Sequence, residues 1–413
     1  MKNFIAHTEQ TRIEMLKSIS CNSIEDLFKQ IPIKFKDFNI ANPLSEMATQ
    51  KEVKALARKN GTEYSIFLGG GVYNKFIPAC VNYIAQRFEF LTAYTPYQPE
   101  ISQGTLQIIY EYQTMISRLT GMDIANASMY DGGSACAEAI LMAHRIAKGK
   151  KNKALVSKHI NTEYKEVIKT YCWAAGIELD WFDTLPDVCA DYCCVLIQNP
   201  DYYGEINEIK KLDTTLVVVA NLSALSILEP PIEADIVVGD IQPLGIPMSF
   251  GGPHAGYMAC KEAYMRQLPG RLVGQTLDAD GKTAYTLTIQ TREQHIKREK
   301  ATSNICSNQS LIALSATLYL SLLGENGFKQ TGIISANLAH KLSDRLEILD
   351  IKTLNKNFFN EFTVETNNSE EFLNKLKSKN ILGGIKLDNK KVLICTTEMN
   401  SEEDIEEYIN ALA

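Results

Sequence analysis

Four short apolar segments, separated by stretches with helical periodicity, constrain the fold of this chain more than any other feature. They lie at Ala154-Leu-Val-Ser, Cys193-Cys-Val-Leu-Ile-Gln, Leu216-Val-Val-Val-Ala and Ala234-Asp-Ile-Val-Val-Gly. Continuous Val and Ile runs, in place of strict alternation, are typical of strands that are covered on both faces. Such strands alternating with helices predict a three-layer α/β domain with a mostly parallel sheet.

Two smaller parts flank this domain. Residues 1–60 are charged and carry helix-capping signals such as Asn22-Ser-Ile-Glu25 and a break near Ile31-Pro-Ile, which predicts an N-terminal helical arm. Residues 326–413 predict a smaller C-terminal α/β domain, and residues 61–325 are left for the large domain. A chain of 413 residues exceeds the size at which one core keeps growing, so more than one domain is expected.

Several helices can be placed by their apolar spacing. A long amphipathic helix is expected from about Gly104 to Leu119, with Gly121 as its stop. Helical periodicity also covers Phe76 to Phe88, Asn304 to Leu323, Gly327 to Leu346, Glu370 to Lys377 and Glu402 to Leu412. The C-terminal strands are predicted at Phe362-Thr-Val-Glu and Lys391-Val-Leu-Ile-Cys.

Composition excludes several classes of function. A formal net charge of -7 argues against nucleic-acid binding, which depends on clustered Lys and Arg. The ten cysteines form no C-x-x-C pair or zinc-spaced cluster, so free thiols in a reducing compartment and no metal site are expected. We find no signal-peptide core and no run near the roughly 18 apolar residues of a membrane span. These features predict a soluble, cytoplasmic protein without a membrane partner.

The loop at residues 241–255 follows the predicted strand that ends at Asp240, and its glycine-rich turn leads into a second strand. This layout resembles pyridoxal-phosphate enzymes of the aspartate-aminotransferase type, where the loop usually carries the lysine that forms a Schiff base with the cofactor. The loop here contains no lysine, and Gln242 stands at about that place. Because an amide nitrogen cannot form an imine, we expect no covalently bound cofactor on this chain.

Asp131-Gly-Gly-Ser134 precedes an Ala-rich helix and has two interpretations. Free amides at a helix start can bind an anion, so Gly133 and Ser134 are candidates for a vestigial phosphate seat. The alternative is ordinary helix capping, in which Ser134 acts as the cap. Gly69-Gly-Gly71 lacks the strand context and spacing of a dinucleotide-binding motif.

Two further segments concentrate polar groups. The stretch Ala93-Tyr-Thr-Pro-Tyr-Gln-Pro-Glu-Ile-Ser-Gln-Gly104 is either a surface that lines a pocket or docks a partner, or a rigid connector. In the second segment, Arg292, Arg298 and Lys300 either face a carboxylate or phosphate or form a solvated helix face. His340-Lys341 lies within a predicted helix and is not a cofactor site.

Taken together, these segments resemble glycine dehydrogenase (decarboxylating), the P-protein of the glycine cleavage system, and within that family the subunit 1 chains of the two-chain enzyme. The resemblance rests on Phe67-Leu-Gly-Gly-Gly-Val-Tyr-Asn-Lys-Phe-Ile-Pro, the stretch from Ala93 to Gly104, Gly239-Asp-Ile-Gln-Pro-Leu-Gly-Ile-Pro-Met-Ser-Phe-Gly-Gly-Pro, Leu268-Pro-Gly-Arg-Leu-Val-Gly, and Arg298-Glu-Lys-Ala-Thr-Ser-Asn-Ile-Cys. The chain departs from the family by being short between Lys148 and Leu222, which leaves the strand count of the sheet open.

The resemblance implies a dependent subunit. A lysine-bearing subunit 2 would hold pyridoxal phosphate covalently, and the pair, as a heterotetramer, would decarboxylate glycine and pass the aminomethyl group to the lipoyl arm of H-protein. This chain would complete the partner's site through residues of the polar loop and of the segment beside the glycine turn: Tyr94, Tyr97, Gln98, Glu100, Ser102, Asn74 and Lys75.

Two alternatives remain from the residues. One is a self-sufficient pyridoxal-phosphate enzyme, such as a lyase or desulfurase, that uses a lysine outside the usual loop. The other is a scaffold or regulatory pseudoenzyme whose pocket never meets substrate.

Overall fold

The computed structural model describes residues 7–32, 40–91 and 94–413. The chain separates into two compact units, of which the first ends at Thr62 and the second spans Glu63–Ala413. Each is described by itself. Ile33 and Ala93, which belong to two segments singled out above, lie outside the described residues.

The first unit is helical, as predicted. Its elements are α1 (Glu9–Ser18), the 3-10 helix η1 (Ile24–Phe28) and α2 (Glu46–Ala57). The capping signal starts one residue later than expected, because Ser23 and Asp26 form the capping box of η1. None of these three helices has a buried residue, so their apolar side chains are not used to build a core within the unit.

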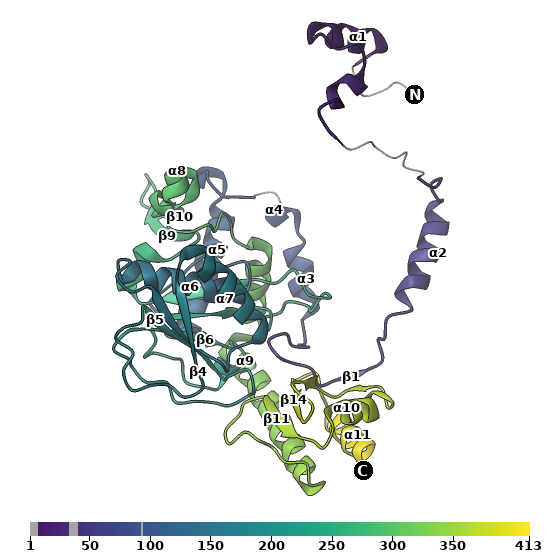
Figure 1. Cartoon of the computed structure of the whole chain (residues 1–413), viewed down its shortest axis with the longest axis vertical. Coiled ribbons are helices and arrows are strands. Elements are labelled where there is room, and N and C mark those ends of the chain that lie inside the picture. The colour runs from purple at the N-terminus through teal and green to yellow at the C-terminus, as the bar shows by residue number, and fades with distance from the viewer. Residues whose placement is uncertain (1–6, 33–39, 92–93) are drawn as a thin grey trace. The chain divides into compact units, whose positions relative to one another are not determined.

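A seven-stranded sheet forms the centre of the second unit (Figure 1). Its order is β2-β8-β7-β6-β5-β3-β4, and only β8 runs antiparallel to its neighbours, which confirms the mostly parallel sheet. The strands are β2 (Ile124–Ala125), β3 (Lys153–Ser157), β4 (Glu178–Phe182), β5 (Cys194–Asn199), β6 (Thr215–Ala220), β7 (Ile236–Asp240) and β8 (Gly256–Cys260).

Helices cover both faces of this sheet, as the continuous apolar runs predicted. Val217, Val219 and Val238 pack on one face with α6 (Gly132–Ile146) and α7 (Thr162–Ala175). Their neighbours in sequence point to the opposite face, where they pack with α3 (Ala79–Ala85), α5 (Gln103–Thr120) and α9 (Ser310–Ile348). Alternate residues of each strand therefore fill two separate cores.

The long helices lie close to the positions that the sequence predicts. The predicted helix near Gly104 is α5, and Gly121 ends it in the left-handed conformation at φ 68°. The two helices predicted from Asn304 to Leu323 and from Gly327 to Leu346 are confirmed as the two parts of α9, which non-helical Gly324 separates, although the first begins only at Ser310. The single helix predicted from Phe76 to Phe88 is wrong in extent, because the structure has α3 and a separate short helix, α4 (Phe88–Leu91), which begins where the prediction ended.

Among the described residues, α9 is the one helix whose length and hydropathy would suffice to cross a bilayer. It contributes Ala313, Ala316 and Tyr319 to the core beneath the large sheet and Leu338 and Leu342 to the C-terminal core.

The C-terminal part contains a three-stranded antiparallel sheet, in the order β11-β14-β13, with two helices. Ser65 and Ile66 of β1 pair in parallel with β12 of this part. Its elements are β11 (Glu361–Glu365), α10 (Ser369–Lys377), β12 (Ile381–Leu382), β13 (Ile385–Lys386), β14 (Lys391–Cys395) and α11 (Glu402–Leu412). The predicted C-terminal strands and helices are confirmed, whereas the domain boundaries at 60 and 325 remain predictions.

The remaining secondary structure is a hairpin of β9 (Leu272–Leu277) and β10 (Thr283–Thr288), together with short helical turns. The turns are η2 (Pro99–Ile101), η3 (Ala224–Ser226), η4 (Glu262–Gln267), η5 (Gln290–Arg292), α8 (Gln294–Lys297) and η6 (Arg298–Lys300). All ten cysteines are free thiols, and seven of them are buried; Cys21, Cys80 and Cys306 are at least partly exposed.

Candidate functional site

A small cavity lies at the ends of the central strands, next to Asp240 at the end of β7. Its volume is about 40 Å³. Ligand crevices of open parallel sheets lie at this edge. The cavity is lined from five segments of the chain that carry Tyr73, Asn161, Tyr164, Gln198, Asn221, Asp240 and Pro243, among others.

Gln242 binds the chain itself instead of a ligand. Its side chain is fully buried, and its Oε1 accepts a hydrogen bond from the Tyr73 amide at 2.9 Å. Its Nε2 donates to the carbonyls of Tyr73 and Ile246, both at 2.9 Å. The residue that stands at about the place of the expected lysine therefore fixes the glycine-rich segment to the loop after β7.

Tyr73 extends from this segment into the cavity. Its hydroxyl donates to Glu361 at 2.7 Å and accepts from Asn221 at 3.0 Å. Glu361 also accepts from the Gly70 amide at 2.6 Å, and burial raises the pKa of its carboxyl. A Cβ on Gly69 would lie 2.2 Å from Glu361 Oε1, so this close approach requires glycine.

The start of α6 is occupied by carboxylates of the chain. Asp131 is the N-cap and accepts from the Ser134 amide at 2.7 Å, while Ser134 Oγ accepts from the Asp131 amide at 3.1 Å. The prediction that Ser134 caps the helix is wrong, because Asp131 has the extended backbone that a cap needs. Asp240 accepts from the Gly132 amide at 3.2 Å, so two amides at the start of α6 are already bound by carboxyl groups of the chain.

The predicted polar loop forms an exposed surface. Tyr94 is 79% exposed and Tyr97 is 52% exposed. Gln98 and Glu100 are exposed as well, and Ser102 is half-buried at the start of α5 without a side-chain capping bond. Tyr94 also lines a cavity of about 520 Å³ with Phe90, Leu91, Ser307, Asn308 and Leu311.

Asn74 and Lys75 contact a different part of the molecule. The Asn74 carbonyl accepts from Thr397 Oγ1 at 2.6 Å, and the Lys75 amine pairs with Glu398. Lys75 is the one buried lysine among the described residues. Because its amine is held by a carboxylate, it is a poor candidate for a Schiff-base lysine outside the usual loop.

Arg292 was expected either to face a carboxylate or phosphate or to lie on a solvated helix face, and it does neither. Arg298 and Lys300 are exposed, but Arg292 is 7% exposed and donates to the carbonyls of Leu268 and Gly270. Arg292 is therefore a buried structural cation, and neither a solvated helix face nor an open anion site describes it. The burial of Arg292 could not be predicted from the charge pattern, because its partners are backbone carbonyls more than twenty residues away.

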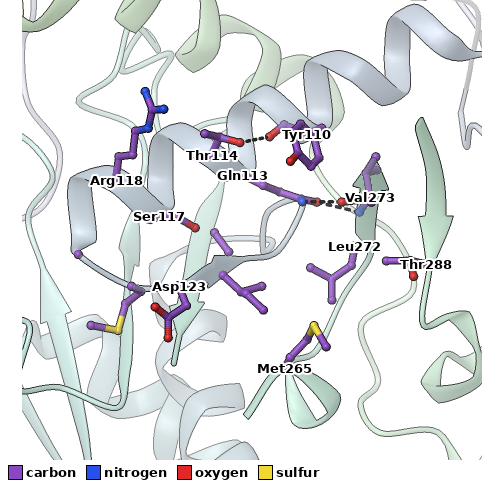
Figure 2. Close-up of a pocket in the computed structure, with 15 residues that line it drawn as sticks. Tyr110, Gln113, Thr114, Ser117, Arg118, Asp123, Met265, Leu272, Val273 and Thr288 are labelled. Atoms are coloured by element: carbon purple, nitrogen blue, oxygen red, sulfur yellow. Dashed lines mark hydrogen bonds between the residues drawn. The ribbon is translucent and has the colours of Figure 1, made fainter. Parts of the chain in front are cut away.

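Sequence reasoning missed a groove of about 610 Å³ between α5, β2 and β9 (Figure 2). Gln113 lies across it and exchanges two hydrogen bonds with the backbone of Val273, at 3.0 and 2.9 Å. Arg118 and Asp123 line the same groove. The available signal in the sequence was Gln113, a polar side chain on the apolar face of a predicted helix. In the structure it bonds the backbone of Val273 and so has a structural role.

The layered sheet and the cavity at its strand ends define the class: the chain has the fold of the aspartate-aminotransferase type of pyridoxal-phosphate enzymes. Its fold is shared with sphingosine-1-phosphate lyase of Burkholderia pseudomallei, at a TM-score of 0.63 and 12% identity over 93% of each chain. A family model described as glycine cleavage system P-protein matches residues 2–412. The chain belongs to this family.

The relatives agree over the full length. "Probable glycine dehydrogenase (decarboxylating) subunit 1" of Geobacillus thermodenitrificans is 43% identical and aligns with 100% of this chain and 99% of its own. The protein of the same name from Desulforamulus reducens is 45% identical over 98% of this chain and 97% of its own. A crystal structure of inhibitor-bound glycine decarboxylase (P-protein) matches with a TM-score of 0.87 and 40% identity over 99% of each chain.

The fold class implies pyridoxal phosphate in the enzyme, and the residues of this chain do not fit that group. Ligand pockets usually measure roughly 300–1,000 Å³, whereas the cavity at the strand ends has about 40 Å³. The loop after β7 has no lysine, and carboxylates take the amides where a phosphate would bind. Of the two residues of the predicted phosphate seat, the Ser134 amide is already bound by Asp131, and the seat itself stays a prediction.

Proposed function

We propose that this chain is subunit 1 of a two-chain glycine dehydrogenase (decarboxylating), in which a partner, subunit 2, holds the pyridoxal phosphate covalently. The single observation that carries the proposal is the cofactor pocket closed by Tyr73, Gln242 and Asp240. A chain of this family that cannot seat the cofactor needs another chain that can. Membership of the P-protein family supplies the reaction, the decarboxylation of glycine.

In this proposal the chain contributes a wall to the partner's site. The exposed loop of Tyr94, Tyr97, Gln98, Glu100 and Ser102 is the better candidate, because it offers hydroxyl, amide and carboxylate groups on a surface that its own core leaves open. These groups can orient the substrate carboxylate and exclude water without covalent chemistry. Asn74 joins them only if the partner also contacts the segment beside Thr397.

The acceptor of the aminomethyl group in this proposal is the lipoyl arm of H-protein. A lipoyl-lysine is long and mostly apolar, and the cavity beside Tyr94 combines apolar residues such as Phe90 and Leu91 with the polar side chains of Ser307 and Asn308. Its volume of about 520 Å³ is in the range of small-ligand pockets. We place the reaction in the cytoplasm, in a heterotetramer of two chains of each kind.

Reconstitution tests the proposal. This chain and a subunit 2 are purified separately and together, and glycine-dependent exchange of CO₂ is measured with lipoylated H-protein present. We expect exchange only when both chains are present, and borohydride to trap the cofactor on a lysine of the partner alone.

The two alternatives predict other results. A self-sufficient enzyme would show visible cofactor absorbance and trapping on this chain by itself. A scaffold would support full exchange after Tyr94→Ala and Tyr97→Ala substitutions that leave assembly intact. Either outcome would replace the proposal.

A further inference from the structure

Arg271 is buried without a carboxylate partner. Its side chain is 2% exposed, and within the part of the chain that the structure describes its guanidinium donates only to neutral oxygens. Nη1 donates to Ser307 Oγ at 3.2 Å and to Asn308 Oδ1 at 3.3 Å, and Nη2 donates to the Cys306 carbonyl at 3.2 Å; Nε has no partner. The buried Glu293 carboxyl acts on Arg271 only through its charge, since no ion pair or hydrogen bond joins the two among the described residues. A buried cation that is hydrogen-bonded by neutral oxygens alone is costly, so its presence calls for a reason other than stability.

The guanidinium lies beneath the ring of Tyr97. Its central carbon is 5.7 Å from the ring centre, within the range of about 6 Å at which a cation is attracted to an aromatic face. The His295 ring contacts Tyr97 in an edge arrangement, with centres 5.5 Å apart at 63°. Tyr97 is nevertheless 52% exposed. One side of its ring contacts Arg271 and His295, and the rest is accessible to solvent.

Arg271 is itself fixed from below. Arg292 donates to the carbonyls of Leu268 and Gly270, the latter at 2.8 Å, and so binds both sides of the turn that precedes Arg271. The Arg271 carbonyl accepts from the Ala127 amide at 2.9 Å. A continuous set of contacts therefore leads from the buried Arg292 through the turn to the exposed ring of Tyr97.

We propose that Arg271 is a positioning residue, which holds Tyr97 and the turn at Cys306–Asn308 in the arrangement that completes the partner's active site. The inference rests on the proposed function, since it gives Tyr97 its role. It goes further by assigning a task to the Leu268–Gly274 segment. Arginine suits this task because its planar fork binds three oxygens of the turn while its face meets the aromatic ring.

The first test compares Arg271→Lys and Arg271→Gln in the complex reconstituted with subunit 2. Lysine keeps the charge and loses the fork, and glutamine loses both. We expect kcat/KM for glycine to fall about tenfold with lysine and further with glutamine, while affinity for subunit 2 and the cofactor absorbance of the complex stay unchanged. Arg266→Gln is the matched control, because Arg266 is exposed in η4, directly before the Leu268–Gly274 segment, and lies outside this set of contacts.

A double-mutant cycle asks whether Arg271 acts through Tyr97. In the Tyr97→Leu background, the Arg271→Lys substitution should cost less than it does in the wild type, since one of the two contacts that it weakens is already gone. Additive losses in the cycle would overturn the inference. So would wild-type kinetics of the folded Arg271 variants, or a fall in thermal stability with unchanged kcat/KM per folded complex, which is the behaviour of a purely structural residue.

A second measurement leaves Arg271 in place, in case its variants do not fold. Phenylalanines with one, two and three ring fluorines at position 97 weaken the negative face of the ring stepwise. We expect kcat/KM to decline with each fluorine relative to phenylalanine, and a flat series would contradict the inference. If the wild-type chain fails to support exchange at all, the proposed function fails; if it supports exchange and only these variants misbehave, the inference alone fails.

Discussion

Hydrogen bonds of single residues close the cavity at the strand ends of this chain. Gln242 is bound to the backbone of Tyr73, and the Tyr73 hydroxyl is bound to Glu361 and Asn221. The sequence shows that glutamine stands at about the place of the expected lysine. It does not show that Tyr73 is the hydrogen-bond partner of Gln242, because Tyr73 lies 169 residues away.

Gln242→Lys tests whether the missing lysine is the only obstacle. We expect no visible cofactor absorbance from the isolated variant with added pyridoxal phosphate, because the cavity is small and the amides of α6 are taken. Loss of the contacts to Tyr73 should also reduce the free energy of unfolding by roughly 1–3 kcal/mol. Gln107→Lys, on the exposed side of α5, is the control, and a yellow, trappable Gln242→Lys protein would show the pocket to be intact.

Asp240 should make stability depend on pH. Burial raises the pKa of this carboxyl from 3.8 to about 7, and the charge of Asp131 adds to the effect. Between pH 4 and 7 the native state therefore holds a proton that the unfolded state has released. Stability should fall as pH rises through this window, by at most about 1.4 kcal/mol per pH unit, and then stay level above pH 7.

Denaturant unfolding of the wild type and Asp240→Asn at pH 5, 6, 7 and 8 measures this contribution. The amide cannot ionise, so the difference in stability between the two proteins should shift in favour of the variant as pH rises to 7. A constant difference from pH 5 to 8 would show that Asp240 does not titrate there.

At the scale of elements, the sequence predicted the helices that have a periodic apolar stripe. It did not predict contacts between segments that are distant in the chain. The amphipathic helix predicted from Gly104 to Leu119 is α5, which is only one residue longer at each end, because its apolar stripe and Gly121 are local signals. Neither of the two interpretations of Arg292 anticipated its burial, because its carbonyl partners come from a separate turn.

The capping of α6 gives a test at this scale. Asp131→Ala removes the acceptor for the Ser134 amide and should cost about 1 kcal/mol in unfolding free energy. Ser134→Ala should cost less, because it removes only the reciprocal bond to the Asp131 amide. Urea unfolding of both variants measures the order, and a larger loss for Ser134→Ala would restore serine as the cap.

At the scale of the whole molecule, the glycine-rich segment ties the strand-edge cavity to the C-terminal part. Glu361 of β11 binds Tyr73, and Glu398 after β14 pairs with Lys75. The Lys75 and Glu398 side chains are 3% and 9% exposed, so this ion pair is sheltered from solvent. The cavity is closed by residues from both ends of the second unit.

Removing one partner of the Lys75–Glu398 ion pair should lower the free energy of unfolding more than removing both partners. Glu398→Gln leaves a buried ammonium without its counter-charge and should cost roughly 3–5 kcal/mol. The double variant Lys75→Met with Glu398→Gln should recover part of the loss, since no buried charge remains. Thermal unfolding of the single and double variants checks this, and equal losses would indicate that the pair is hydrated.

The sequence by itself determined the parallel sheet, its cover on both faces, the missing lysine and the P-protein family, because each depends on residue types within one short segment. Tertiary structure alone decided that Tyr73 and Gln242 close the cavity, that Asp131 and Asp240 fill the start of α6, and that Arg271 lies beneath Tyr97. Apart from the local Asp131 cap, those outcomes depend on contacts between residues 108 to 174 positions apart. Local patterns carry no information on which distant side chain reaches a given atom.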